Sequence, residues 1–264
     1  MKRSKLPLAA GLLLTGLVAS AAQAQSILPP AERYKLRLEG FTWGTTLERQ
    51  IQKGFGSTSG TLLDLSEDLG VESKRTYGAD GAIQFTPGIK LRGSYTKIDY
   101  SGAATARQNF TFGDDQYFFG EAIETRIQGK LYTAALEWDF VKKPQGFLGA
   151  FIGAKLLDGD FVVLAPGTGK RDVESGIGGL PVLGITTRFY SGKHFSAETE
   201  YSGMTIGSRG SVWELHVSAR LHLSDRLAAM GGYRRLRLRG EPTKARDFVE
   251  VKLSGAIFGV ELSL

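Results

Sequence analysis

One segment of the sequence carries the residue types of nucleophilic catalysis at a spacing that a strand would bring together. His194 and Ser196 are two residues apart, and Glu198 follows two residues later. Side chains in a β-strand alternate between two faces, so all three would lie on the same face. A histidine base beside a serine hydroxyl, with an acid nearby, is the arrangement that activates serine as a nucleophile. The direction in which that face points then decides whether a substrate reaches it.

The composition excludes several other kinds of site. The 264 residues include no cysteine, which removes disulfides, thiol nucleophiles, cysteine zinc sites and iron–sulfur clusters, and three histidines leave little room for a histidine metal site. Residues 166–170 imitate a phosphate-binding loop, but Leu164 replaces its first glycine and Arg171 replaces the hydroxyl that binds magnesium. We therefore expect no cofactor and no metal.

The first 24 residues have the pattern of a secretory signal peptide. Lys2, Arg3 and Lys5 precede a short apolar run over residues 6–18, and the small-x-small triplet Ala22-Gln23-Ala24 follows. A membrane anchor is the alternative, but the run is shorter than the ~20 residues of a spanning helix. We expect cleavage after Ala24, with residues 25–264 forming one mature domain.

The basic balance of the chain has a simple origin. The formal net charge is +6, and three of the bases lie in residues 1–24. A basic chain prompts a nucleic-acid hypothesis. Because the signal peptide carries half of the excess and directs export, we expect no nucleic-acid partner.

Apolar and polar residues alternate along most of the remaining sequence. Tyr132, Leu136 and Trp138, for example, alternate with Glu137 and Asp139. A period of two indicates a strand with one apolar face. The pattern predicts ten strands, with eight as the alternative count, at residues 36–39, 79–85, 90–100, 132–140, 148–154, 183–189, 195–202, 213–221, 229–238 and 258–264.

The ninth of these strands changes phase. Tyr233 belongs to the odd-numbered apolar set, whereas Leu236 and Leu238 are even-numbered. An extra residue in one strand of a pair produces such a change. The sequence therefore predicts a β-bulge near Arg235.

The predicted connections alternate between short and long. Short turns are expected at residues 86–88, 142–146, 191–193 and 224–226, and polar loops at 44–74, 101–127, 158–179, 205–210 and 240–247. Each of the first three loops carries a net charge of −2. Short turns at one end and long loops at the other are typical of outer-membrane barrels. The first loop also contains the apolar–acidic stretch 62–69, which we expect to fold over the barrel mouth.

Two features favour a barrel whose apolar face meets lipid over a soluble barrel with an apolar interior. The strands have about 10–12 residues, which matches the ~9–11 tilted residues needed to cross hydrocarbon. Aromatic residues expected at the lipid–water boundaries lie near strand ends: Tyr34, Trp43, Phe85, Trp138, Phe140, Phe189, Phe195 and Trp213. Since lipid offers no hydrogen bonds to a strand edge, the predicted fold is an all-β, closed antiparallel transmembrane β-barrel.

The chain resembles small Gram-negative outer-membrane β-barrel proteins. The resemblance rests on the signal peptide, the repeated strands across 32–264 and the terminal Phe258-x-Val260-x-Leu262-x-Leu264. Such barrels end in an aromatic residue that signals insertion to the barrel assembly machinery, and Leu264 stands at that place here. The resemblance implies location in the cell outer membrane, with outer-membrane lipid, lipopolysaccharide and the assembly machinery as partners. We expect a monomer.

With apolar side chains turned to lipid, the opposite face of each strand lines a narrow lumen. Fourteen ionisable residues lie on these faces: Arg37, Glu39, Asp80, Lys90, Arg92, Glu137, Asp139, Lys155, Arg188, Glu198, Glu200, Glu214, Arg220 and Arg234. They form either a structural salt-bridge network that closes the lumen or a polar path for small solutes. Buried charges in a small barrel must pair, which favours the network.

Two outer-membrane enzyme classes resemble parts of the sequence. Lipid A deacylases resemble the His194–Ser196 spacing, but His194 lies beside a turn on the periplasmic side, and lipid A is in the opposite leaflet. Omptin-like proteases have ten strands and an Asp–His couple near the outer rim, but neither His216 nor His222 has an Asp two residues away, and the acidic pair Asp114-Asp115 has no nearby histidine. We expect no enzyme activity and a structural or surface-interaction role. The alternatives are a narrow pore for small solutes and a lipid-modifying enzyme.

Overall fold

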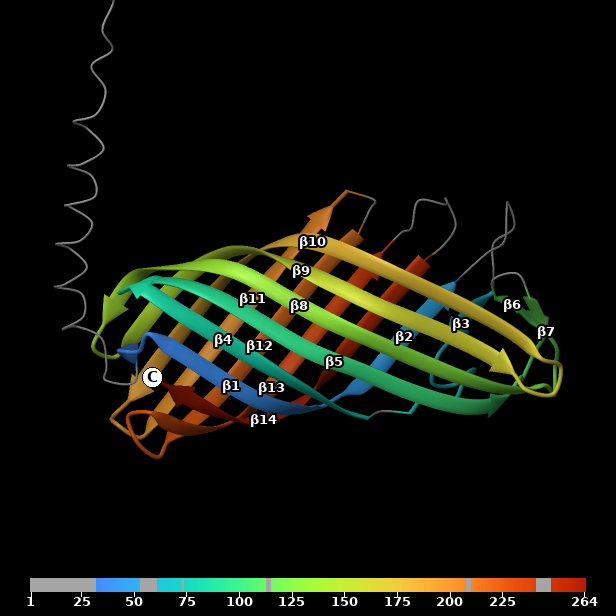
Figure 1. Ribbon diagram of the computed structural model, residues 1–264, viewed down its shortest axis with the longest axis horizontal. Helices are drawn as coiled ribbons and strands as arrows, with labels where there is room; N and C mark the ends of the chain where they lie inside the picture. The colour runs from blue at the N-terminus through green and yellow to red at the C-terminus, as the bar shows by residue number, and fades with distance from the viewer. Residues whose placement is uncertain (1–31, 53–60, 73, 113–114, 208–209, 241–247) are drawn as a thin grey trace, which may run out of the picture.

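The computed structural model describes residues 32–52, 61–72, 74–112, 115–207, 210–240 and 248–264 (Figure 1). The expected signal peptide, residues 1–24, lies outside them. The strands are β1 (Leu36–Gly44), β2 (Thr46–Gln52), β3 (Leu62–Asp64), β4 (Arg75–Thr86), β5 (Ile89–Thr105), β6 (Phe110–Phe112), β7 (Asp115–Tyr117), β8 (Ala122–Lys143), β9 (Gly146–Ala165), β10 (Lys170–Ser191), β11 (Phe195–Ile206), β12 (Gly210–His222), β13 (Leu227–Gly240) and β14 (Phe248–Ser263). Among the described residues, no helix has the length and apolar character needed to cross a membrane.

Ten of these strands form a closed antiparallel barrel. The order is β1-β4-β5-β8-β9-β10-β11-β12-β13-β14, and β14 pairs back with β1. In this closing pair Arg37 lies opposite Ser263, and Trp43 lies opposite Ile257. Closure leaves no free edge in the ring, as a strand in lipid requires. The predicted fold class and the count of ten strands are confirmed.

The barrel has a turn end and a loop end. The end of β14 and the tight turns β4–β5, β8–β9, β10–β11 and β12–β13 lie together at the turn end, on the left in Figure 1. Gly88 (φ 101°) and Gly192 (φ 70°) occupy left-handed conformations in two of these turns. The small β6–β7 hairpin lies at the loop end, on the right. The four predicted short turns are confirmed.

Two of the predicted long loops are wrong because the strands continue through them, and the loop predicted at 44–74 is wrong in part because it contains β2, which pairs with β14, and β3. β8 and β10 have 22 residues each, and β9 has 20. The expected loop at 101–127 shrinks to the connection 106–121, and that at 158–179 shrinks to the turn 166–169. Where these strands extend beyond the lipid, their outer face contacts water, so their residues do not alternate between apolar and polar.

The barrel wall therefore has unequal height. The pairing of β10 with β11 begins only at Leu183, opposite Gly203, while β10 pairs with β9 from Lys170 onward. We call the parts of β8, β9 and β10 on the loop-end side of Leu136, Ile152 and Leu183 the long wall. Strands β11–β14 form the short wall. In Figure 1 the long wall reaches the right-hand end of the molecule.

The outer face carries two rings of aromatic side chains. Near the turn end, the most exposed are Phe85, Trp138, Phe140, Phe189 and Phe195. Further along the strands, the pairs Tyr95–Tyr132 and Tyr201–Trp213 lie with ring centroids 5.3 Å and 5.8 Å apart. Exposed aliphatic side chains fill the band between, which matches a lipid-facing surface with interfacial aromatics.

Two of the expected boundary aromatics are placed wrongly by the sequence argument. Tyr34 and Trp43 are 5% and 0% exposed and lie inside the barrel. Trp43 is odd-numbered on a strand whose outward residues are even-numbered, such as Leu38. Its position near a strand end therefore did not indicate its face.

The predicted bulge near Arg235 is absent, because β13 pairs residue for residue with both neighbours. Leu236 points inward and is fully buried, while Arg235 points outward. The lumen beyond the charged region is apolar, so an inward leucine needs no phase change. Register shifts occur instead at Gln84/Thr86 and Asp139/Val141, near the turn end.

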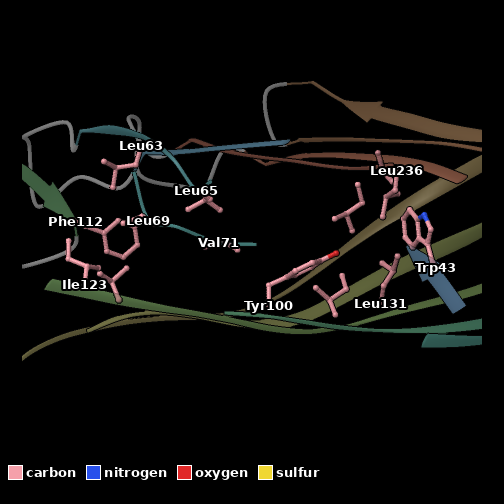
Figure 2. Close-up of a cluster of buried hydrophobic side chains, with 14 of the residues drawn as sticks. Trp43, Leu63, Leu65, Leu69, Val71, Tyr100, Phe112, Ile123, Leu131 and Leu236 are labelled. Carbon is pink, nitrogen blue, oxygen red and sulfur yellow. The ribbon is translucent and has the colours of Figure 1, made fainter. Parts of the chain in front are cut away.

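An apolar plug fills the lumen at the loop end (Figure 2). It consists of Leu63, Leu65, Leu69 and Val71, each at most 3% exposed. They pack in one buried cluster with wall side chains such as Tyr100. The segment expected to fold over the mouth thus lies within it.

Gly102 lets the plug lie close against β5. It forms an isolated bridge with Val71, and a Cβ atom on Gly102 would lie 2.6 Å from the backbone of Gly70. Gly70 itself has a φ of 63°. The contact is therefore backbone against backbone, with no room for a side chain.

Candidate functional site

The fourteen ionisable residues predicted for the polar face all point into the lumen. Asp80, Arg92 and Glu200 are partly buried, and the other eleven are buried. They come from nine of the ten barrel strands, and the alternation within each strand turns them inward. The structure brings them together in three neighbouring groups between the turn end and the apolar plug.

The first group surrounds Lys90 on β5. Its Nζ lies 2.9 Å from Oε1 of Glu137 and 2.8 Å from Oδ2 of Asp139, both on the adjacent β8. Nζ also lies 3.7 Å from the centre of the Phe147 ring. Arg92 links this group across the lumen, with Nη1 2.9 Å from Glu137 and Nη2 2.5 Å from Glu200.

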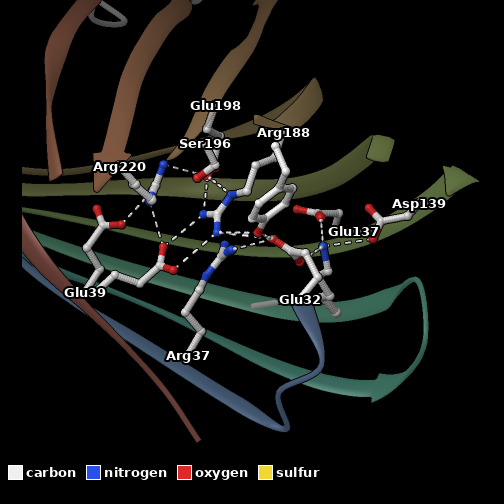
Figure 3. A network of polar contacts seen from close by, with 12 residues as sticks. Glu32, Arg37, Glu39, Glu137, Asp139, Arg188, Ser196, Glu198 and Arg220 are labelled. Carbon is white, nitrogen blue, oxygen red and sulfur yellow. Dashed lines mark hydrogen bonds and ion pairs between the residues drawn. The ribbon is translucent and has the colours of Figure 1, made fainter. Parts of the chain in front are cut away.

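The second group contains two arginines that share acidic partners (Figure 3). Arg188 Nε donates to Glu198 at 2.7 Å, and Arg188 Nη2 donates to Glu261 at 3.0 Å. Arg220 Nη1 lies 3.0 Å from Glu198, its Nε donates to Glu261 at 2.7 Å, and its Nη2 donates to Glu39 at 2.8 Å. These bonds join β1, β10, β11, β12 and β14 across the bore.

The third group marks the boundary between the charged and the apolar parts of the lumen. Glu214 accepts a hydrogen bond from Arg234 Nε at 2.5 Å and pairs with Lys155. The guanidinium carbon of Arg234 lies 5.0 Å from the centre of the Trp43 ring. Trp43 thus packs a cation on one side and belongs to the buried apolar cluster on the other.

Two members of the network were missed in the sequence. Glu32 lies 3.2 Å from Arg188 and accepts a hydrogen bond from the hydroxyl of Tyr190 at 2.7 Å. It precedes β1, so no strand pattern pointed to it. Glu261 did carry a signal, because it alternates with the outward residues Val260 and Leu262 of β14.

The network leaves little open space. With Glu32 and Glu261, the charged network contains nine acidic and seven basic residues. Among them lies a cavity of about 50 Å³, lined in part by Asp80, Glu200 and His216. Asp80 Oδ1 and His216 Nε2 find no hydrogen-bond partner among the described residues. Since a water molecule occupies ~30 Å³ in the liquid, this cavity has room for one or two waters.

The serine–histidine arrangement differs from the one that the sequence spacing implied. Ser196 Oγ lies 2.8 Å from Nε2 of His222, on the next strand, whereas His194 lies at the rim and its Nδ1 approaches only the carbonyl of His222 at 3.5 Å. Glu198 is bound to Arg188 and Arg220. Ser196 and His222 are 4% and 5% exposed. The pair has base–nucleophile geometry, but the carboxylate expected to complete it is engaged elsewhere.

The position of the histidines bears on protease chemistry. The chain has three, and the structure describes all of them. His194 and His222 lie at the turn end, and His216 lines the lumen cavity. The loop-end rim therefore has no histidine for an Asp–His couple. Within the described parts of the chain, no group of three or more His, Asp or Glu side chains has the arrangement of a metal site.

Comparison with known proteins gives the fold. No family model matches the chain, and no curated protein matches it. Among solved structures, the outer membrane protease OmpT from Escherichia coli has a TM-score of 0.55 and 9% identity, covering 87% of this chain and 96% of that one. Ail of Yersinia pestis has a TM-score of 0.36 and 11% identity, with 84% and 98% covered. OprG from Pseudomonas aeruginosa has a TM-score of 0.38 and 8% identity, with 88% and 98% covered. The chain thus has the fold of a Gram-negative outer-membrane β-barrel.

Proposed function

We propose that the protein is an outer-membrane barrel with a structural or surface-interaction role, a non-conducting lumen and no catalytic activity. The observation that carries this proposal is the charged network, in which Arg92, Arg188 and Arg220 each contact at least two carboxylates, at least one of them on a strand that is not adjacent in the sheet. Buried ion pairs are costly to break singly, because the remaining charge is left without a partner.

The small volume left open in the lumen also supports a closed barrel. An ion passing the network would need to displace paired side chains, since the cavity among them is about 50 Å³. The apolar plug adds a second obstruction nearer the loop end, with Leu63 and Leu69 fully buried. Two obstructions of different chemistry favour a closed barrel over a pore.

Planar-bilayer recording tests the closed lumen. The refolded full barrel should show no steady conductance at neutral pH, and reproducible single-channel currents would overturn the proposal. Under the alternative of a narrow pore, Arg92→Gln and Glu137→Gln should change ion selectivity in opposite directions. A closed barrel gives no current in either variant.

We also propose that the outer face of the short wall contacts phosphate groups of lipopolysaccharide. Arg235 and Arg237 face outward and lie opposite Leu215 and Trp213. They are therefore level with the aromatic ring that lies nearer the loop end. Lys252 lies opposite Arg237, and both pair with Glu250, so three cations and one carboxylate leave this strip net basic above the lipid-facing band. Charge-assisted bonds to phosphate suit such arginines.

A lipid exchange experiment tests this contact. The thermal midpoint of the wild-type barrel should rise more with phosphorylated than with dephosphorylated lipid A. The double variant Arg235→Gln/Arg237→Gln should lose that difference, and an unchanged difference would contradict the assignment. We further propose a monomer inserted by the barrel assembly machinery, which the self-closure of β1 on β14 supports.

A further inference from the structure

Three carboxylates lie side by side on neighbouring strands in the wall of the lumen. Glu39 on β1 lies directly opposite Glu261 on β14 and directly opposite Asp80 on β4. Glu39 and Glu261 are buried, and Glu39 and Asp80 line the lumen cavity described above. Like charges at directly opposite positions of a sheet repel each other. This row of acids therefore needs positive charge beside it.

The arginine beside the row binds two of its three members. Arg220 donates to Glu261 at 2.7 Å and to Glu39 at 2.8 Å, and Figure 3 shows the contact with Glu39. Asp80 forms no ion pair with any described residue, whereas the other eight acids of the charged network each do. Asp80 Oδ1 and Glu39 Oε1 are both buried, and neither has a hydrogen-bond partner among the described residues. Two adjacent carboxylates thus each keep one oxygen unused.

The cations around the cavity do not compensate Asp80. Five of them line it, and each contacts a carboxylate other than Asp80: Arg37, Arg92, Lys155, Arg220 and Arg234. Within the described network, nine acids face seven bases, which leaves two negative charges in excess. Because Asp80 has no cationic partner, one of the two lies there. A buried ionised group is costly without a compensating charge.

The cavity provides room for that charge. Its lining brings Glu39 and Asp80 together with Ser94, which lies opposite Asp80 in the β4–β5 ladder, and with the unpartnered Nε2 of His216. Carboxylate, hydroxyl and water oxygens suit hard cations. Ca²⁺ takes ~6–8 oxygen ligands and Mg²⁺ keeps several waters. A cavity of about 50 Å³ is too small for either hydrated ion, and one uncompensated carboxylate calls for a single positive charge.

We infer that the lumen binds one sodium ion between Glu39 and Asp80. The two unused carboxylate oxygens are its protein ligands, and the Ser94 hydroxyl and water complete its shell. The ion supplies the positive charge that the row of three carboxylates lacks. The site depends on these two acids and not on whether the barrel conducts, so bilayer recording and the experiments below test separate proposals.

Sodium-dependent stability tests the site. The full barrel is unfolded in urea at pH 8 and constant ionic strength, with sodium chloride exchanged for N-methylglucamine chloride, whose cation is too large for the cavity. An ion that binds only the folded state stabilises it by mass action. Raising Na⁺ from ~1 to ~200 mM should therefore lower the unfolding equilibrium constant about tenfold. Equal stability in the two salts, combined with a rise on acidification, would assign a proton to this site and overturn the proposal.

A matched pair of variants locates the ion. Asp80→Asn should abolish the sodium response and should be at least as stable as the wild type without sodium, because it removes the repulsion with Glu39 and breaks no ion pair. Asp139→Asn changes an acid outside the cavity lining whose partner is Lys90, at 2.8 Å. It should lower stability and keep the full sodium response. A sodium response retained in Asp80→Asn would exclude the site, and a heat-modifiability gel confirms that both variants fold.

Thallium(I) locates the ion directly, since it replaces monovalent cations and scatters anomalously. Crystals of the wild-type barrel grown with thallium(I) nitrate in place of sodium salts should show an anomalous peak between the carboxylates of Glu39 and Asp80. Crystals of Asp80→Asn should lack this peak. A wild-type lumen without the peak would overturn the assignment.

Discussion

Arg188 and Glu198 lie directly opposite each other in the β10–β11 ladder, and Arg188 Nε donates to Glu198 Oε2 at 2.7 Å. Both side chains are buried, and Glu198 also pairs with Arg220. Glu198→Gln should therefore lower the free energy of unfolding by ~3–5 kcal/mol, because two buried cations lose a shared partner. Urea unfolding in detergent micelles, followed by tryptophan fluorescence, measures the loss.

An outward ion pair provides the control. Arg237 donates to Glu250 at 2.6 Å, but its side chain is 48% exposed. Glu250→Gln should cost at most ~1 kcal/mol, since exposed pairs contribute little. Equal losses at Glu198 and Glu250 would contradict the structural role of the network.

The plug depends on the close approach of β5 and the segment that precedes β4. Gly102→Ala should displace residues 61–72, because the new Cβ atom would lie 2.6 Å from the Gly70 backbone. Overpacking of this kind costs ~1–3 kcal/mol. Protease added from the loop end should then cleave within the segment faster than in the wild type.

Gly129→Ala is the matched control, since a Cβ atom there would meet its nearest neighbour at 3.5 Å. Cleavage in this variant should remain at the wild-type rate. Wild-type cleavage in Gly102→Ala would mean that the bridge to Val71 does not hold the plug.

The connection between β7 and β8 should respond to acid. The Thr168 hydroxyl, the Phe118 backbone N–H and the Lys170 ammonium group all donate to Glu121, and they hold its pKa below the ordinary value of 4.5. A depressed folded-state pKa stabilises the connection above pH 4.5 and loses that effect as pH falls through the depressed pKa. Amide protection at Phe118 should therefore decrease between pH 6 and pH 3.

Glu121→Gln removes the titrating group and should give low, pH-independent protection at Phe118 over the same range. A wild-type profile that is equally flat would show that these bonds do not tie the connection to the β9–β10 turn.

The Ser196–His222 pair should be structural. Ser196→Ala removes one buried hydrogen bond and should cost ~1 kcal/mol in unfolding free energy. Mass spectra of lipid A from cells that express the wild type, the variant or neither should be identical. A wild-type change that the variant abolishes would establish a lipid-modifying enzyme instead.

The alternation in the sequence was sufficient to predict the barrel, because the lipid-facing half of each strand must be apolar. Tyr132 to Phe140 illustrates this signal. It ends where β8 and β9 leave the membrane, and this is why the sequence predicts loops at residues 101–127 and 158–179. Leu63, Leu65 and Leu69 gave a comparable signal, which predicted that this segment folds over the barrel mouth.

The lumen chemistry was only partly predictable. Alternation placed Arg188 and Glu198 on inward faces, but the partnership of Ser196 with His222 depends on the register between β11 and β12, which no local pattern encodes. Leu236 is predicted on the outer face, wrongly, because a barrel interior is expected to be polar throughout. Trp43 is predicted at the lipid–water boundary, wrongly, because closeness to a strand end does not show on which face of the strand a side chain lies.

The long sequence separation of the network partners has a consequence for biogenesis. Glu39 and Arg220 are 181 residues apart, and Arg188 and Glu261 are 73 apart. The bond from Glu39 on the first strand forms only when that strand meets the last ones, and the bond from Arg188 forms only when the last strand is in place. A seam joined one residue out of step would turn these ionised groups toward hydrocarbon. The buried charges thus make correct closure an all-or-none event, and they penalise a misaligned barrel before it is released into the bilayer.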